Sequence, residues 1–184
     1  MAKAYIVLDQ DDGHRIFRIK IEWPEKTLAS QVIHLRQVRA EDEAFLFALF
    51  RTPQEAEFAP LPQPQRETLL RLQYQARCRD YAARFPHAED FIVEFCGQTA
   101  GRLLLNREAR ELRVVDIAVV PELQRQGIAS AVLTSLIAEA KAAGIALRLS
   151  VWHSNPALAL YRRLGFRLRA GTATHLELEW RPGP

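Results

Sequence analysis

An apolar strand followed by a long alanine-rich helix constrains this chain most strongly. Residues 112–120 are nearly all Val, Ile, Leu and Ala, which is typical of a strand covered on both faces of a sheet. After Pro121, apolar residues recur at helical spacing over about residues 125–143, and Gly144 is a typical C-terminal stop. Residues 145–151 then alternate as a second strand. This order of elements predicts a sheet flanked by helices.

Most of the remaining chain continues the alternation of strands and helices. The predicted strands are residues 33–38, 91–95, 102–105, 166–169 and 174–180, and the predicted helices are residues 41–51, about 66–85 and 155–164. A turn at Gly97-Gln98 would join two of the strands as an antiparallel pair, and a proline-rich loop separates the first two helices. We therefore predict an α+β fold with a mixed, mostly antiparallel central sheet flanked by helices.

The first 31 residues predict a β-hairpin extension and a linker. Apolar and charged residues alternate from Phe17 to Trp23, the turn signal Asp12-Gly13 precedes them, Tyr5–Leu8 supplies a partner strand, and Pro24 ends the run. A lone hairpin is barely stable in water, so it must pack on the rest of the chain or on a second copy. We expect residues 32–182 to form the main domain, and the extension to close a groove or a homodimer.

Composition excludes several classes of protein. The chain has 184 residues, of which 48% are hydrophobic and 26% charged, so it can form a normal core. Its formal net charge is only +3, and no apolar run approaches the roughly 18–20 residues of a membrane helix. Cys78 and Cys96 form no CxxC pair and the histidines show no metal-binding spacing, so we expect two buried thiols, no metal and a cytoplasmic location.

The turn between the buried strand and the long helix predicts an anion-binding site. The first N–H groups of a helix have no internal acceptor, and the helix dipole adds partial positive charge there. Gly127 would let a phosphate approach the backbone, and Ala129 is small enough not to block it. Arg125 and Gln126 could add side-chain donors. When this segment is considered alone, the alternative interpretation is an ordinary helix start whose turn contains a glycine.

Two motifs together resemble the GNAT superfamily of N-acetyltransferases. The segment Gln124-Arg-Gln-Gly127-Ile-Ala129 matches the coenzyme A signature Q/R-x-x-G-x-G/A at its three fixed positions. The downstream signature N-x-x-A-x-x-L-Y-x-x-x-G-F matches at Asn155, Leu160, Tyr161, Gly165 and Phe166, whereas Ala157 and Ala159 flank the expected alanine position. The order of strands from Ile33 to Trp180 also fits, so the resemblance covers all but the N-terminal hairpin.

The resemblance implies acetyl-CoA as cosubstrate, with no metal. It implies that the strand at 112–120 splays from the strand at 145–151, that the pantetheine arm bonds the backbone near Ile117 and Val119, and that the pyrophosphate lies on the amides of residues 125–130. The coenzyme-binding residues expected on this basis are Ile117, Ala118, Val119, Gln124, Arg125, Gln126, Gly127, Ile128, Ala129, Ser130, Asn155 and Tyr161. Asn155 would face the coenzyme arm, with a plain helix N-cap as its alternative role.

The same resemblance assigns Tyr161 as the general acid that protonates the departing thiolate. A tyrosine on an amphipathic helix is otherwise a core residue. Asp116 is the only charge within residues 114–120 and is a candidate general base, although strand alternation points it away from Ile117 and Val119, which favours a structural role. Glu94 and His153 are the other candidates for the base.

The function that follows is direct transfer of an acetyl group from acetyl-CoA to a primary amine in a ternary complex. The acceptor groove would lie along residues 39–85 and 168–176, where Glu55 and Glu57 could attract a cationic amine. The sequence leaves open whether the acceptor is a protein amine or a small molecule. A catalytically inactive coenzyme A-binding regulatory module would need neither Tyr161 nor a base. A nucleic-acid surface is not expected, because the arginines are scattered between apolar positions.

Overall fold

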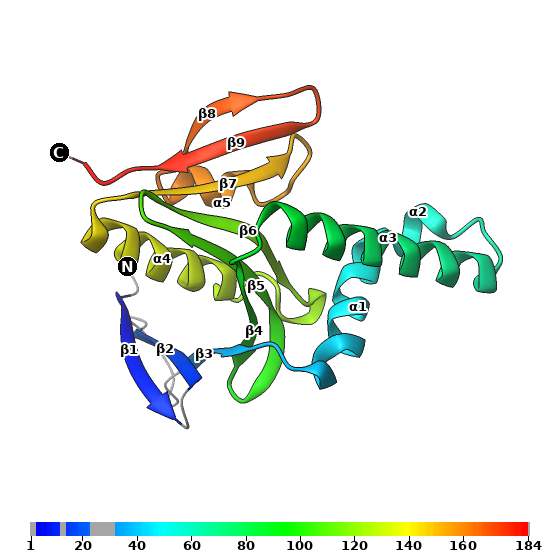
Figure 1. Cartoon of the computed structure of the whole chain (residues 1–184), viewed down its shortest axis with the longest axis horizontal. Coiled ribbons are helices and arrows are strands. Elements are labelled where there is room, and N and C mark those ends of the chain that lie inside the picture. Colours follow the sequence, from blue (N-terminus) through cyan, green and yellow to red (C-terminus); the bar gives the residue numbers. More distant parts are fainter. Residues whose placement is uncertain (1–2, 12–13, 23–31, 184) are drawn as a thin grey trace. The chain divides into compact units, whose positions relative to one another are not determined.

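Nine strands and five α-helices make up the described part of the chain (Figure 1). The computed structural model describes residues 3–11, 14–22 and 32–183. The strands are β1 (Lys3–Asp11), β2 (His14–Glu22), β3 (Val32–Gln37), β4 (Glu89–Phe95), β5 (Gln98–Glu108), β6 (Glu111–Val119), β7 (Ala146–Trp152), β8 (Arg167–Gly171) and β9 (His175–Trp180). The helices are α1 (Glu43–Arg51), α2 (Glu55–Phe58), α3 (Gln63–Arg84), α4 (Ile128–Ala143) and α5 (Leu158–Arg163), with short 3-10 turns at Ala40–Asp42, Thr52–Gln54 and Pro121–Leu123.

The strands form one sheet in the order β1-β2-β3-β4-β5-β6-β7-β9-β8. Every neighbouring pair is antiparallel except β6 and β7, which run parallel because α4 connects them as a crossover. The predicted fold class is confirmed. The chain divides into two units, residues 1–37 with 89–184, which hold the whole sheet with α4 and α5, and residues 38–88, which hold α1, α2 and α3.

The N-terminal hairpin is present. Strands β1 and β2 pair from Lys3↔Glu22 to Asp11↔His14, and β2 continues the sheet by pairing with β3. The predicted turn at Asp12-Gly13, and the predicted strand end at Trp23 and Pro24, lie outside the described residues. The boundary between residues 31 and 32, the homodimer and the cytoplasmic location stay predictions.

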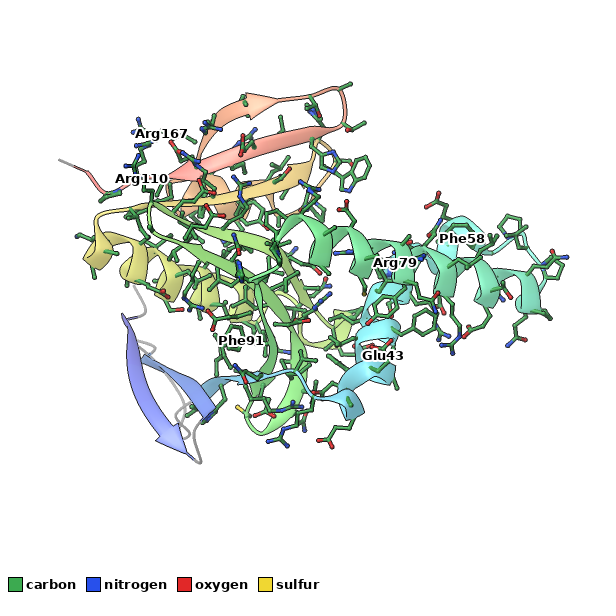
Figure 2. The ribbon with its side chains drawn as sticks, in the orientation of Figure 1. Glu43, Phe58, Arg79, Phe91, Arg110 and Arg167 are labelled. Atoms are coloured by element: carbon green, nitrogen blue, oxygen red, sulfur yellow. The ribbon has the colours of Figure 1, made fainter. Side chains whose placement is uncertain are left out.

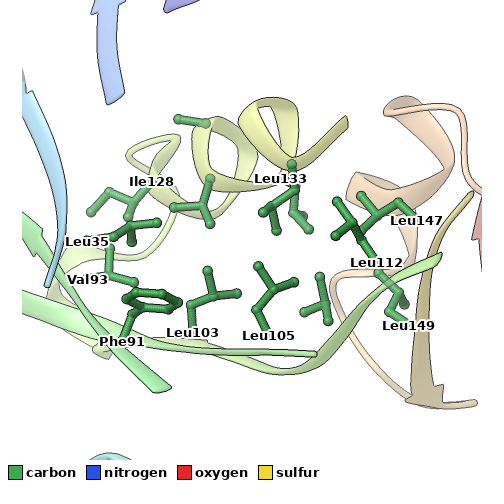
Figure 3. Packing of buried hydrophobic residues seen from close by; sticks show 14 of the residues in the cluster. Leu35, Phe91, Val93, Leu103, Leu105, Leu112, Ile128, Leu133, Leu147 and Leu149 are labelled. Atoms are coloured by element: carbon green, nitrogen blue, oxygen red, sulfur yellow. The ribbon is translucent and has the colours of Figure 1, made fainter. Parts of the chain in front are cut away.

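One hydrophobic core joins the sheet to α4 and α5. Figure 3 shows Ile128 and Leu133 of α4 facing Leu103 and Leu105 of β5, with Phe91 beside them. The predicted helical stripe of α4 is buried as expected, and so is the alternating apolar set of β7: Ile128, Val132, Leu136 and Ala140 in the helix, and Leu147, Leu149 and Val151 in the strand. The core therefore packs α4 against the face of the sheet to which these β7 side chains point.

The opposite face of β6, β7 and β9 carries a lattice of ion pairs. Arg113 bonds Glu177 (3.1 Å), and Arg148 bonds Glu111 and also Glu179 (2.7 Å). The lattice continues through Arg169 to Glu177 and through Arg181 to Glu179. Arg110 and Arg167, labelled in Figure 2, flank it where β6 and β8 begin. This face is polar and held by charge, whereas the core face is apolar.

The unit of residues 38–88 has its own small aromatic cluster. The Tyr74 ring packs edge-on against Phe47 (centroids 5.5 Å apart), and its hydroxyl donates to Glu43 (3.3 Å). The proline-rich segment is more ordered than predicted, because it contains α2 and because α3 already begins at Gln63. Pro64 fits inside α3, since the first turn of a helix needs no N–H donor.

Three further details differ from the sequence predictions. The turn between β4 and β5 is Cys96-Gly97, one residue earlier, because both residues have positive φ (51° and 77°) and Phe95 already pairs with Gln98. Cys96 is consequently exposed and Cys78 only half-buried, so the prediction of two buried thiols is wrong. Residues 115–119 of β6 are also only half-buried, for the reason given below.

Candidate active site

The central feature of the site is a β-bulge at Val115. Leu104 pairs with Asp116 and Leu105 with Val114, so Val115 is the extra residue of β6. A bulge bends the strand and increases its local twist. The parallel pairing of β6 with β7 stops at this point, with Val114↔Leu149 as its last pair. The two strands therefore part along residues 115–119, which explains why this half of β6 is not covered.

The backbone of Val119 faces the side that β7 has left. Val120 donates its N–H to the Ala100 carbonyl of β5 (2.9 Å), so by the alternation of an antiparallel ladder Val119 directs its own groups away from β5. Its carbonyl accepts a hydrogen bond from the Gln124 side chain (3.0 Å). The side chains of Ile117 and Val119 pack against the core, and Ala118 lies between them on the other face. A strip of open backbone thus follows the bulge.

The turn before α4 presents its N–H groups at the same end of β6. Gly127 is the N-cap with φ 84°, and no side chain of the described residues caps this end. The first helical bond is from the Ala131 N–H to the Gly127 carbonyl (2.9 Å), so Ile128, Ala129 and Ser130 have no acceptor within the helix. The helix begins three residues later than predicted, because Arg125 also adopts a positive φ of 62°. Arg125 and Gln126 are exposed in this turn.

Tyr161 lies on α5, and its ring packs edge-on against Phe166 with the centroids 5.8 Å apart. The residue is only 4% exposed. Its hydroxyl makes no hydrogen bond within the part of the chain that the structure describes. Burial raises the pKa of this hydroxyl to about 12, and the negative charge of Asp116 adds to the rise. The group is therefore a neutral donor at physiological pH.

Asp116 belongs to a series of ion pairs between acidic and basic side chains on the polar face of the sheet. Its carboxylate lies 3.6 Å from the Arg102 guanidinium, which also forms a two-pronged contact with Asp90 (2.8 and 2.7 Å). The bulge places Asp116 on the face opposite Ile117 and Val119, as strand alternation predicted. Arg102 escaped the sequence analysis, because nothing local to β5 marks it as the partner of a residue on β6.

Asn155 fixes the loop between β7 and α5. Its Oδ1 accepts a hydrogen bond from the Ala157 N–H two residues later (2.8 Å), and its backbone carbonyl accepts one from Leu158 (3.2 Å). The helix N-cap is Ala157, so the predicted N-cap role of Asn155 is wrong in detail: the side chain closes an Asx turn one step before the helix.

The other candidates for the general base, and the two acids expected to attract the acceptor amine, have partners or positions of their own. Glu94 is ion-paired with Arg36 (2.7 Å), and Glu55 with Arg51 (2.9 Å). His153 bonds the Thr172 carbonyl through its Nε2 atom (2.9 Å), which ties the β7–α5 loop to the β8–β9 turn. Glu57 is exposed on α2.

Gly101 is a site residue that the sequence analysis missed. A Cβ atom built on it would meet the Ala118 carbonyl oxygen, so the residue permits β5 and β6 to approach closely beside the bulge. A glycine inside an apolar strand pattern is a recognised signal of close backbone approach, and Ala100-Gly101 carries that signal.

Neither a metal cluster nor a membrane span is present in the described residues. They contain no group of three or more His, Cys, Asp or Glu side chains able to hold a metal ion. Within the same ranges, no helix has both the length and the apolar content needed to cross a membrane.

Comparison with known proteins identifies the family of the fold. Residues 36–166 match the model of the Acetyltransferase (GNAT) family. No curated protein matches the sequence. A solved structure of the PaiA N-acetyltransferase from Thermoplasma acidophilum in complex with coenzyme A is 18% identical, with a TM-score of 0.61, and the match covers 81% of this chain and 98% of that one.

Two further structures resemble the chain to a similar degree. An acetyltransferase from Thermus thermophilus is 19% identical with a TM-score of 0.57, covering 81% of this chain and 96% of that one. The ribosomal-protein-S18-alanine N-acetyltransferase from Escherichia coli is 19% identical with a TM-score of 0.54, covering 81% and 93%. At these identities the likeness concerns the fold.

Proposed function

The chain belongs to the Acetyltransferase (GNAT) family, and on that premise we propose that it transfers an acetyl group from acetyl-CoA to a primary amine by direct attack in a ternary complex. The observation that carries the proposal is the parting of β6 and β7 beyond the pair Val114↔Leu149, at the end where α4 begins without a side-chain cap. An open strand edge and a set of free helical amides at one place suit a long ligand with a diphosphate at one end.

The residues present fit acetyl-CoA in two respects. The amides of Ile128, Ala129 and Ser130 with the dipole of α4 suit the diphosphate, and the positive φ of Gly127 turns the backbone toward that position without a Cβ in the way. The open edge of Ile117–Val119 suits the pantetheine amides, which would bond it as an added strand does. In this arrangement Gln124 is a support, because its side chain holds the Val119 carbonyl.

The proposed chemistry needs few protein groups. Acetyl-CoA supplies an activated acetyl thioester. The acceptor nitrogen forms the new bond to the acetyl carbon, the carbon–sulfur bond breaks, and holding the two reactants together supplies the orientation advantage. In the proposed reaction the Val119 N–H stabilises negative charge on the acetyl oxygen, and Tyr161 gives its proton to the departing sulfur. The proton that the nitrogen loses as the amide forms then replaces the one that Tyr161 gave.

The proton of the acceptor amine needs a separate destination. Amines are mostly protonated at neutral pH, near the lysine reference pKa of about 10.4, so one proton must leave before attack. Asp116 is the proposed base. Its competing role is that of an electrostatic partner for Tyr161, because after burial its negative charge is the second cause of the raised pKa of that hydroxyl. The alkaline titration described in the Discussion separates these two roles.

The experiment that tests the function measures thiol release from acetyl-CoA with a panel of primary amines. Gly127→Glu puts bulk and negative charge at the proposed diphosphate position, so we expect loss of acetyl-CoA binding and turnover. Gly144→Glu is the matched control, since Gly144 caps the other end of α4 with φ 66° and has open space around it. It bears the same backbone strain without touching the site.

The outcomes separate enzyme from regulator. Turnover that is lost in Gly127→Glu and kept in Gly144→Glu supports the proposal. Acetyl-CoA binding without turnover by any amine favours a coenzyme A-binding regulatory module. Equal binding by the two variants contradicts the placement of the diphosphate.

A further inference from the structure

Among the described residues, four large apolar side chains are exposed, and one of them stands where the diverging strands open. Leu69 and Leu72 lie on α3 and Leu168 on the edge strand β8, whereas Trp152 is the last residue of β7 and is 57% exposed. The indole combines a large apolar area with one polar N–H group, so an exposed tryptophan beside a proposed active site is a candidate contact for a ligand.

The position of Trp152 follows from the strand register. It comes three residues after Leu149, the last residue of β7 that pairs with β6, so it lies on the part of β7 that has left β6. Val151 points into the core, and strand alternation puts Trp152 on the opposite, polar face of the sheet. Asp116 lies on that same face, on the other diverging strand.

The indole is held in place by its neighbours. Trp152 stands opposite His175 of β9, and their ring centroids are 4.1 Å apart. The His175 Nδ1 atom and the Thr174 hydroxyl are hydrogen-bonded (2.9 Å). The next residue, His153, donates its backbone N–H to the Thr174 carbonyl (3.1 Å), which ties the loop after β7 to the β8–β9 turn. The imidazole therefore packs against the indole at an interplanar angle of 38° and backs it from β9.

The coenzyme and the acceptor would approach from opposite faces of the sheet. The free amides of α4 lie on the core face of the sheet, because α4 packs there. A coenzyme bound to them would enter the gap from that side, which leaves the polar face for the acceptor. Trp152 is on the polar face. We propose that Trp152, backed by His175, is the binding platform for the organic group of the acceptor, and that the preferred acceptors are primary amines carrying a flat aromatic group; this inference rests on the proposed function.

The surrounding charges favour contact with a neutral ring over a second cation. Glu177 pairs with Ser150, which lies two residues before Trp152 on the same face of β7. Its carboxylate is already bonded to Arg113 and Arg169, and those bonds outweigh burial and lower its pKa. Glu179, the next acid on β9, is bonded to Arg148 and Arg181. The acidic side chains of β9 nearest to Trp152 are thus neutralised by arginines. Trp152 would therefore discriminate between acceptors by ring stacking and apolar contact.

The experiment compares 2-phenylethylamine with ethanolamine as acceptors for the wild type, Trp152→Ala and Trp152→Phe. We expect Trp152→Ala to raise KM for 2-phenylethylamine about tenfold or more, the loss of one aromatic stacking contact with its buried area. KM for ethanolamine and the affinity for acetyl-CoA should not change. Trp152→Phe should restore most of the affinity. Lys141→Ala is the control, because Lys141 is exposed in the last turn of α4, outside both the expected acceptor groove and the coenzyme site.

The results distinguish this inference from the proposed function. An equal change for both amines in Trp152→Ala, or no change for either, overturns the inference while acetyl transfer stands. If no amine is acetylated, the proposed function fails. In that case saturation-transfer NMR of 2-phenylethylamine with the coenzyme A-loaded protein decides: binding that needs Trp152 supports the platform, and binding that does not need it, or no binding, overturns it.

Discussion

A Cβ atom on Gly101 would overlap the carbonyl oxygen of Ala118 and lie 3.1 Å from the Val119 Cα. Both atoms belong to the backbone of β6, so neither can turn aside as the end of a side chain does. Gly101 therefore allows β5 to hold the diverging half of β6 at short range, next to the bulge at Val115. We therefore expect the position of this half of β6, and with it the proposed coenzyme gap, to be sensitive to a side chain at residue 101.

The first prediction concerns this contact. Gly101→Ala should push Ala118 and Val119 away from β5 and weaken acetyl-CoA binding about tenfold or more, with a stability loss of about 1–3 kcal/mol from overpacking. Gly171→Ala is the matched control, because a Cβ on that strand residue meets Leu176 at an ordinary 3.6 Å. Calorimetric titration with acetyl-CoA and urea unfolding measure the two effects. A stability loss with unchanged acetyl-CoA affinity would show that Gly101 supports only the fold.

The second prediction concerns the proton donor. Tyr161→Phe keeps the ring that packs on Phe166 and removes only the hydroxyl, so the fold and the acetyl-CoA affinity should be retained. Turnover should fall by about 10²–10⁴, the range typical of a lost general acid. Steady-state kinetics with saturating acetyl-CoA measure it. Unchanged turnover would remove the acid role and leave Tyr161 as a core residue.

The third prediction concerns alkaline pH. A general acid acts only while it is protonated. Burial and the charge of Asp116 raise the pKa of Tyr161 to about 12. The pH profile of wild-type kcat should therefore show no alkaline limb, that is, no fall caused by ionisation of Tyr161, until well above pH 10. Asp116→Asn removes a charge that repels the phenolate. The pKa of Tyr161 should then fall, although burial keeps it above its ordinary value, and the limb should move to lower pH.

The same titration decides the role of Asp116. If Asp116 is the base, Asp116→Asn should lower kcat by about 10² or more across the whole pH range. If it acts only through its charge, the neutral-pH rate should persist and only the alkaline limb should move. Asp90→Asn is the control, since it removes a carboxylate from the same Arg102 and should leave the limb unmoved. An unmoved limb in Asp116→Asn with an unchanged rate would exclude both roles.

The main elements were predictable from the sequence because each carries a clear period. The stripe of α4 and the alternation of β7 are buried as expected, and Gly144 ends the helix with φ 66°. The bulge at Val115 was not predictable, because an extra residue inside an apolar strand leaves the apolar run unbroken. The start of α4 was placed too early for a related reason: Arg125 adopts a left-handed conformation that its residue type does not favour.

The contacts of the site were less predictable than its elements. Residues such as Arg102 and Asp116 meet across neighbouring strands, and only the register brings them together. Trp152 was not recognised as a site residue, although the alternation of β7 places it with Arg148 and Ser150 on the polar face. Its position beside the gap could not be predicted, because it depends on where the pairing of β6 with β7 ends.

The fourth prediction concerns acid stability. The Glu179 carboxylate is bonded to Arg181 and Arg148, and these bonds hold its pKa below the ordinary value of 4.5. A lowered folded-state pKa contributes stability above the unfolded pKa, and this contribution is lost as the pH falls through the folded value. Glu179→Gln should therefore be less stable than the wild type at neutral pH, with the difference shrinking below about pH 4.5. Glu57→Gln, at an exposed position, is the control; urea unfolding across pH measures both, and a difference independent of pH would contradict the ion-pair account.

The most direct test of the central claim is an amide chemical-shift titration of the 15N-labelled protein with acetyl-CoA. The account predicts that the largest shifts fall on the amides of residues 126–130 and on Ile117 and Val119, the free helical end and the open edge of β6. Shifts confined to other parts of the chain, or saturation with these amides unmoved, would contradict it.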